Sequence, residues 1–246
     1  MHGAMWDNSH GNSFDSLEQL RILEREIISC KKCPRLVEYR EKVAREKRRA
    51  FRDWTYWGRP VPGFGDPRAQ LFILGLAPAA HGANRTGRVF TGDRSGEFLY
   101  AALHKTGFAN QPSSLHRDDG LTLKNAFIAA TVRCAPPANK PLPSEMLNCR
   151  GYLERELELV RPKVVLALGK IAWDAYLDVL KSAGLIASRA KFVFAHGAVA
   201  KVPGSGPRLV GVYHPSQQNT QTGRLTPAMY REVLNRIRQM LSDGQG

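Results

Sequence analysis

The chain of 246 residues has no run of eighteen apolar residues, so the sequence offers no stretch that could cross a bilayer as a helix. Its first residues, MHGAMWDNSHGNSF, lack the basic start and apolar core of a secretion signal. Internal repeats and low-complexity segments are also absent. These absences predict a soluble, cytoplasmic, monomeric protein with a flexible N-terminus over 1–14 and a single domain over 15–246.

Acidic residues are scarce relative to basic ones. The chain has 36 Lys and Arg against 22 Asp and Glu, which leaves a formal net charge of +14 at pH 7. Such a surplus can raise a potential of several kT over part of the surface and predicts a polyanionic partner, although an unspecialised basic surface is the alternative. Because no lipidation signal or amphipathic anchor accompanies the charge, nucleic acid is favoured over membrane.

Apolar segments of strand and helix length alternate from residue 69 onward. This alternation predicts an α/β fold with a mostly parallel sheet of four to five strands and helices on both faces. We expect strands at 69–76, 126–133, 163–169, 191–195 and 208–213, and helices from 15 to about 29 and at 34–51, 95–106, 143–160, 170–183 and 227–244. Residues 54–67 are too rich in Pro, Gly and aromatic residues to be regular.

Only four cysteines occur: Cys30, Cys33, Cys134 and Cys149. A disulfide framework conflicts with the expected cytoplasmic location, and a redox C-x-x-C pair would leave the other two cysteines without a role. Zinc and an iron–sulfur cluster both accept four thiolates, and the spacing does not decide between them. Four separate buried thiols are the remaining alternative. A metal site here would be structural and would tie the N-terminal helix to the α/β core.

The segment GLAPAAHGANRTGRVFTGD (75–93) begins where a buried strand ends, which is where open α/β sheets place their ligands. It lacks the G-x-x-x-x-G-K-[ST] and G-x-G-x-x-G patterns of phosphate-binding loops, which counts against a nucleotide hydrolase.

Four motifs in one order resemble the uracil-DNA glycosylase superfamily, and within it the iron–sulfur proteins of family 5. They are GLAP, GRVFTGD, CAPPANKPLP (134–143) and VYHPSQQNTQTGRLT (212–226), accompanied by the four cysteines. The resemblance implies a three-layer α/β/α fold, a [4Fe-4S] cluster on the cysteines, with zinc the less favoured metal, and removal of damaged bases from double-stranded DNA, with single-stranded DNA as a second candidate substrate. Where family 4 has a glutamate in its first motif this sequence has Leu76, so its first carboxylate is Asp93.

Cleavage of an N-glycosidic bond builds positive charge on the sugar and negative charge on the departing base. By the resemblance, Asp93 holds the attacking water and stabilises the sugar, although an N-cap of the following helix is the plainer role for it. His214, at the start of HPS, would donate a hydrogen bond to the base oxygen that becomes anionic. A structural histidine is the alternative there.

The resemblance also suggests residues that contact the base and the DNA. Phe90 would stack on an extruded base unless it is a core residue, and small residues at Gly75 and Ala77 would let the backbone approach the base edge. The remaining candidates for the base are His81, Asn84 and Asn139, and those for DNA are Arg85, Arg88, Arg94, Gln221 and Arg224, with basic residues of 40–52.

One departure predicts broad specificity. Family 4 proteins carry an asparagine four residues before the third cysteine, where this chain has Ala130. Its loss predicts action on uracil and also on hypoxanthine or etheno bases. A lesion-binding protein without catalysis, stabilised by its metal, is the other alternative. No lysine lies in a helix-hairpin-helix context, so no Schiff-base step is expected.

Overall fold

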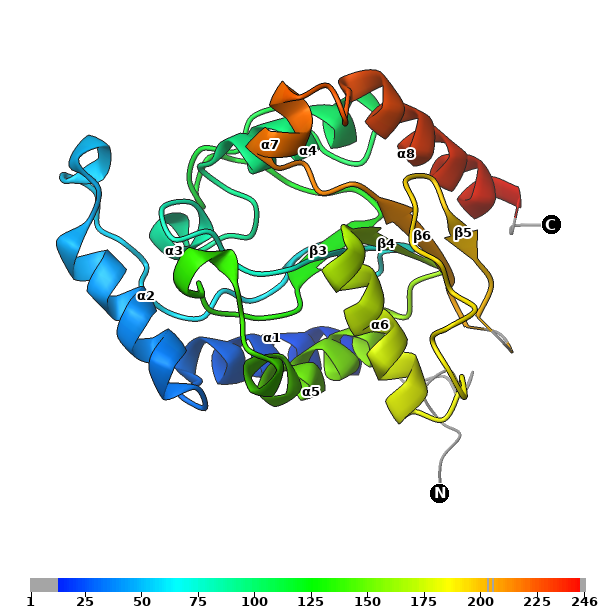
Figure 1. Ribbon diagram of the computed structural model, residues 1–246, viewed down its shortest axis with the longest axis horizontal. Coiled ribbons are helices and arrows are strands. Elements are labelled where there is room, and N and C mark those ends of the chain that lie inside the picture. Colours follow the sequence, from blue (N-terminus) through cyan, green and yellow to red (C-terminus); the bar gives the residue numbers. More distant parts are fainter. Residues whose placement is uncertain (1–12, 203, 205, 244–246) are drawn as a thin grey trace.

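The structure is a computed structural model and describes residues 13–202, 204 and 206–243 (Figure 1). Residues 1–12 of the predicted flexible N-terminus lie outside this part. The helices are α1 (Ser13–Ser29), α2 (Pro34–Glu46), α3 (Ala83–Thr86), α4 (Arg94–Lys105), α5 (Pro143–Val160), α6 (Lys170–Ser182), α7 (Gln217–Gln221) and α8 (Pro227–Ser242), with short 3-10 turns η1 (Arg49–Phe51) and η2 (Pro137–Asn139). The strands are β1 (Phe64–Gly65), β2 (Leu71–Gly75), β3 (Ala126–Ala130), β4 (Val164–Leu168), β5 (Val199–Ala200) and β6 (Arg208–Val212).

The strands form one sheet in the order β1-β3-β2-β4-β6-β5. The four inner strands are parallel, and the two-residue strands β1 and β5 pair antiparallel at the edges. Strand β2, first in sequence among the parallel strands, has β3 on one side and β4 on the other. The strand order therefore reverses beside β2, and the carboxyl ends of β2 and β4 border the crevice where α/β sheets bind ligands.

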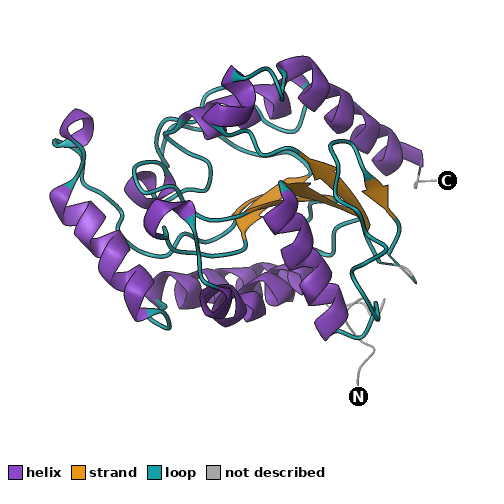
Figure 2. Cartoon of the chain, in the orientation of Figure 1, coloured by secondary structure: helices purple, strands orange, loops and turns teal. Residues whose placement is uncertain are grey.

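Helices cover both faces of the sheet (Figure 2). Alternate residues of β2 enter different cores: Leu71 and Ile73 pack with α4 and α8, whereas Phe72 and Leu74 pack with α5 and α6. Each such fully buried side chain stabilises the fold by about 1.5–3 kcal/mol. The three-layer α/β/α arrangement that the sequence predicts is thereby confirmed. Among the described residues, none of the helices combines the length and apolarity that crossing a membrane requires.

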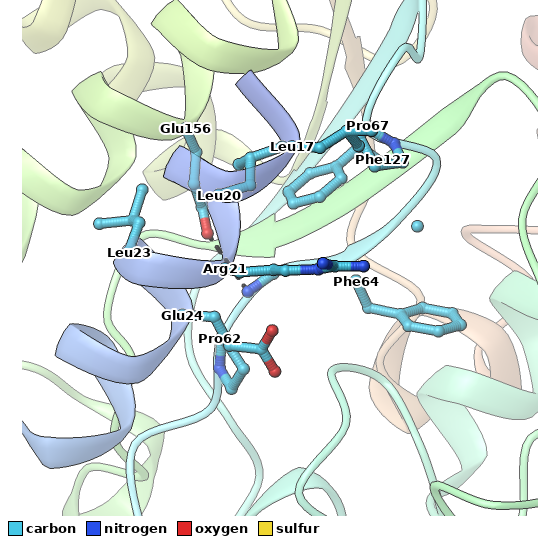
Figure 3. A pocket seen from close by; sticks show the side chains of 12 residues that line it. Leu17, Leu20, Arg21, Leu23, Glu24, Pro62, Phe64, Pro67, Phe127 and Glu156 are labelled. Carbon is cyan, nitrogen blue, oxygen red and sulfur yellow. Dashed lines mark hydrogen bonds between the residues drawn. The ribbon is translucent and has the colours of Figure 1, made fainter. Parts of the chain in front are cut away.

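Helix α1 lies outside this framework and packs on α5 through Leu23 and Ile27. A hollow of about 280 Å³ lies between α1 and the segment around β1 (Figure 3). The Glu156 carboxylate borders it, but Arg133 and the Gly63 backbone N–H already donate hydrogen bonds to that carboxylate. The role of the Glu156 carboxylate is therefore structural.

Three sequence predictions need correction. The sheet has six strands, whereas four to five were predicted; the short edge strands β1 and β5 were not expected. Residues 191–195 form a loop, since β5 occupies the edge of β6; Phe192 and Phe194 still pack on the core. The helix predicted over 34–51 ends at Glu46, because Lys47 adopts a left-handed conformation with φ of 55°.

Candidate active site

A cavity of about 660 Å³ opens at the carboxyl ends of the parallel strands. Leu76 follows β2, Ala130 ends β3, Gly169 follows β4 and His214 follows β6, and all four line it. Asp93 and Phe90 line the same cavity, so the three residues on which the predicted chemistry depends are brought together. The chain thus gathers them from segments more than one hundred residues apart.

Phe90 enters the cavity because two glycines make room for it. Its backbone is left-handed, with φ of 50°. A Cβ on Gly75 would lie 2.6 Å from the Phe90 ring, and one on Gly96 would lie 1.8 Å from the Phe90 carbonyl oxygen. Gly75 therefore supports Phe90 from behind and does not itself line the cavity. This corrects the prediction that Gly75 borders the base directly.

Asp93 is both the N-cap of α4 and a wall of the cavity. Its Oδ1 accepts a hydrogen bond from the Gly96 N–H at 2.9 Å. Burial raises the pKa of the carboxyl, an effect that the Gly96 and Ser95 backbone N–H groups partly oppose. A carboxylate offers about four lone-pair positions, so capping leaves room for a water. The two alternatives for Asp93 are thus compatible.

The imidazole of His214 faces the Phe90 ring, with ring centroids 6.0 Å apart. Burial lowers the pKa of His214 to about 4. The ring is therefore neutral at neutral pH and can donate one hydrogen bond. Its backbone is held by Asn219, whose Nδ2 donates to the His214 carbonyl oxygen at 2.9 Å.

Asn219 was not predicted from the sequence, although an amide shortly after HPS was a usable signal. Ser216 caps α7 by accepting from the Asn219 N–H at 3.3 Å, so the HPS turn and α7 form one unit. Lys170 and Ile171, at the start of α6, also line the cavity and were missed. Ile171 is 48% exposed, which places an apolar side chain at the mouth.

Ala77 and Asn139 line the cavity as predicted. Asn139 is exposed at its rim, in a left-handed conformation with φ of 56°. His81 and Asn84 do not line it. His81 Nδ1 is 3.0 Å from the Tyr56 hydroxyl, and the fully buried Asn84 donates to the carbonyl oxygens of Arg40 and Ala80. The prediction that these two contact the base is corrected.

Two of the arginines assigned to DNA phosphates are interior residues. Arg88 is 4% exposed and pairs with Asp119 at 2.8 Å. Arg85 is 3% exposed, and its Nε and Nη2 donate to the carbonyl oxygens of His81 and Gly92, each at 2.8 Å. Both arginines stabilise the loop before α4, so the prediction of direct phosphate contacts is wrong for them.

The other DNA candidates are accessible. Arg94 is exposed and lines the cavity. Gln221, at the end of α7, and Arg224, beyond it, are exposed, and the Arg224 guanidinium lies 4.7 Å from the centre of the Tyr213 ring. These three residues remain predicted DNA contacts.

The four cysteines surround one small cavity between α1, α2, the end of β3 and α5. None of the four forms a disulfide bond. Arg40 Nη1 donates to Cys134 Sγ at 3.0 Å, and Asn148 Nδ2 donates to Cys33 Sγ at 3.4 Å. Within the described ranges, no three His, Cys, Asp or Glu side chains are grouped so as to hold a single metal ion.

Comparison with known proteins agrees with this geometry. Residues 62–238 match the model of the uracil DNA glycosylase superfamily. The chain belongs to this superfamily. The matched residues include the sheet, Phe90, Asp93 and His214, so the predicted resemblance to this superfamily and the predicted fold are confirmed.

Within the superfamily, the chain is more similar to type-5 than to type-4 uracil-DNA glycosylases. It is 53% identical to the type-5 uracil-DNA glycosylase of Mycobacterium tuberculosis over 213 residues, which is 86% of this chain and 78% of that protein. It is 50% identical to that of Thermus thermophilus over 215 residues, 87% and 94% of the two chains. The type-4 uracil-DNA glycosylase of Archaeoglobus fulgidus is 29% identical over 203 residues, 81% and 83% of the two chains.

Proposed function

We propose that this protein removes uracil from DNA by hydrolysing the N-glycosidic bond of a nucleotide swung out of the helix. The observation that supports this most directly is the single cavity shared by Asp93, Phe90 and His214. A base inside a duplex cannot reach such a cavity unless it is extruded. The names of the type-5 relatives agree with this activity.

In the proposed reaction, the extruded base lies against the Phe90 ring, and His214 donates a hydrogen bond to the base oxygen that gains charge. The bond between C1′ and the base nitrogen breaks, and its electron pair leaves with the base. Asp93 stabilises the cationic sugar and holds the water that attacks C1′, taking a proton from it. The neutral imidazole of His214 can donate without first being protonated.

The proposal extends to other damaged bases, including hypoxanthine and etheno bases. Ala130 presents only a methyl group where family 4 places an amide, and it lines the cavity. Without a group that reads the hydrogen-bonding edge of uracil, bases with other edges are not rejected by an unpaired polar group. Selection should then depend on ease of extrusion and on the stability of the departing anion.

We also propose that the four cysteines hold a [4Fe-4S] cluster. Four thiolates can bind either zinc or an iron–sulfur cluster, and the family resemblance favours the cluster. The cysteines surround one cavity, and Arg40 and Asn148 direct N–H groups at two of their sulfurs, as neighbours of metal ligands do. The cluster would fasten α1 and α2 to the catalytic core.

The test is a product assay on duplex and single-stranded oligonucleotides that contain one uracil. Free uracil and an alkali-labile site in equal amounts support glycosidic hydrolysis. Tight binding with neither product at high protein excess would support a lesion-binding protein instead. Parallel substrates with hypoxanthine test the wider range, and iron and sulfide analysis tests the cluster.

A further inference from the structure

A second cleft lies behind the loop that carries Asp93. It has a volume of about 440 Å³ and is formed by residues 54–59, α3 and residues 116–118. Helix α2 lies alongside α3 at this end of the molecule (Figure 1). The cleft shares no lining residue with the base cavity, but both border the segment 76–95. It is therefore a separate site next to the proposed active site.

One wall of the cleft holds a buried cation. The guanidinium of Arg85 lies 4.0 Å from the ring centres of both Phe51 and Trp54. Its Nη1 has no hydrogen-bond partner, and no ion pair found among the described residues includes Arg85. The Asp93 carboxylate interacts electrostatically with this guanidinium but forms no direct ion pair with it. A buried positive charge that faces aromatic rings and has no directly paired carboxylate attracts anions to its surroundings.

The exposed part of the lining is basic. Arg117 lies 4.7 Å and Arg59 lies 5.8 Å from the Trp57 ring centre. Arg88 fixes the backbone of this part of the lining, because its Nη1 donates to the Arg117 carbonyl oxygen at 3.1 Å. The only carboxylate lining the cleft, within the described part of the chain, is that of Asp118. Arg88 thus supports the cleft from behind, Arg85 is a buried part of its lining, and Arg59 and Arg117 are exposed parts of it.

Partly exposed indole rings beside exposed arginines suit one ligand chemistry. Single-stranded nucleic acid is bound by aromatic faces for the bases and by cations for the phosphates. Trp54 and Trp57 are both partly exposed in the cleft. An acidic peptide would not use the indole faces for stacking.

We propose that this cleft binds a nucleotide of the DNA strand outside the extruded base, with its base on the indoles of Trp54 and Trp57 and its phosphate on Arg59 and Arg117. The proposal rests on the proposed glycosylase function and extends it with a second DNA contact. Since Arg85 Nη2 donates to the carbonyl oxygen of Gly92, the residue before Asp93, the contact would lie against the loop that positions the catalytic carboxylate.

The test measures binding of a 30-mer duplex with one central uracil, in the Asp93→Asn background so that little substrate is cleaved during the measurement. The test protein is a double variant, Arg59→Gln combined with Arg117→Gln, and both substituted residues are exposed. The matched control is Arg208→Gln, exposed at the start of β6 and therefore at the opposite end of the sheet. Thermal denaturation verifies that all three proteins are equally folded.

We expect the double variant to bind at least tenfold more weakly at low salt. The steepness of log K against log salt should fall by about 1, because both arginines are proposed to neutralise the same phosphate. Arg208→Gln should match the parent. Equal affinity and slope in the double variant and the control would overturn the proposal. A second result would also overturn it. In this result, tryptophan fluorescence shows that the parent protein binds free thymidine monophosphate at micromolar concentration and that the double variant does not, yet the two proteins bind the duplex equally well. The cleft would then bind free nucleotides and not the DNA strand.

The product assay separates this proposal from the proposed function. If the wild-type protein forms no abasic site from uracil duplex, the glycosylase function fails, whatever the binding data show. If abasic product forms and the double variant binds like Arg208→Gln, the cleft proposal alone fails.

Discussion

Replacing Asp93 by asparagine should separate catalysis from stability. Asparagine caps helices about as well as aspartate, so the bond to the Gly96 N–H can be kept. Burial raises the pKa of Asp93, which means that the ionised carboxylate is less favourable in the folded chain than in the unfolded one, so its charge opposes folding. Asp93→Asn removes this unfavourable charge. The variant should be as stable as the wild type or more stable.

The rate of base release should fall sharply in the same variant. Loss of one preorganised electrostatic group commonly costs about 10²–10³ in rate, or about 2.7–4 kcal/mol of barrier. The assay is single-turnover cleavage of a uracil duplex at protein excess, followed by alkali, alongside urea denaturation. Activity of the wild type should also decline on acidification at a pH above the ordinary range of an aspartate, because ionised Asp93 is required.

Thr226→Ala is the matched control. Thr226 caps α8 by accepting a hydrogen bond from the Met229 N–H at 3.3 Å, away from the cavity. Its loss should cost about 1 kcal/mol of unfolding free energy and leave the cleavage rate unchanged. Retention of the Asp93→Asn rate within tenfold of wild type would refute the assignment of the carboxylate. A loss of rate that merely follows a loss of stability would refute it equally.

Three further predictions concern neighbouring residues. Burial lowers the pKa of His214 to about 4 from an ordinary 6.5, so between these pH values the imidazole is protonated in the unfolded chain but not in the folded one. The free energy of unfolding of the wild type, relative to that of His214→Gln, should therefore fall by roughly 3 kcal/mol as the pH drops from 6.5 to 4. Urea titrations at several pH values measure this difference. A difference independent of pH would contradict this. Arg88→Gln should cost about 3–5 kcal/mol of unfolding free energy, because it leaves the buried Asp119 without its ion-pair partner. Arg94→Gln should change the unfolding free energy by less than about 0.5 kcal/mol. It should instead reduce the steepness with which log K of DNA binding falls with log salt by about 1. The reverse pattern would restore Arg88 as a phosphate contact. Ala130→Asn should retain uracil release and lose hypoxanthine release, and an unchanged product range would contradict the role of Ala130.

The strands and the cavity could be predicted because both follow from local patterns. Buried parallel strands are continuous apolar runs, and their carboxyl ends meet at one edge of the sheet. Segments following β2 and β6 therefore had to approach each other, which brought Phe90, Asp93 and His214 together. The N-cap role of Asp93 was equally local, because it depends only on the helix that follows.

Side-chain direction within the loop could not be predicted in the same way. Arg85 and Arg88 show their charge in the sequence but not their burial, which depends on Trp54 and on Asp119, both distant along the chain. His81 and Asn84 follow the strand, yet the turn into α3 directs them toward Tyr56 and Arg40. Contacts of this kind are tertiary, and residue spacing does not encode them.

The proposed chemistry requires that an extruded uracil occupy the cavity between Asp93, Phe90 and His214. Determining the structure of the Asp93→Asn variant bound to a duplex with a single uracil tests this requirement most directly. We expect the uracil ring against Phe90, one of its oxygens within hydrogen-bond distance of the His214 imidazole, and the introduced asparagine beside the sugar. A uracil that remains stacked in the duplex, or that occupies any other hollow of the protein, would contradict the proposed chemistry.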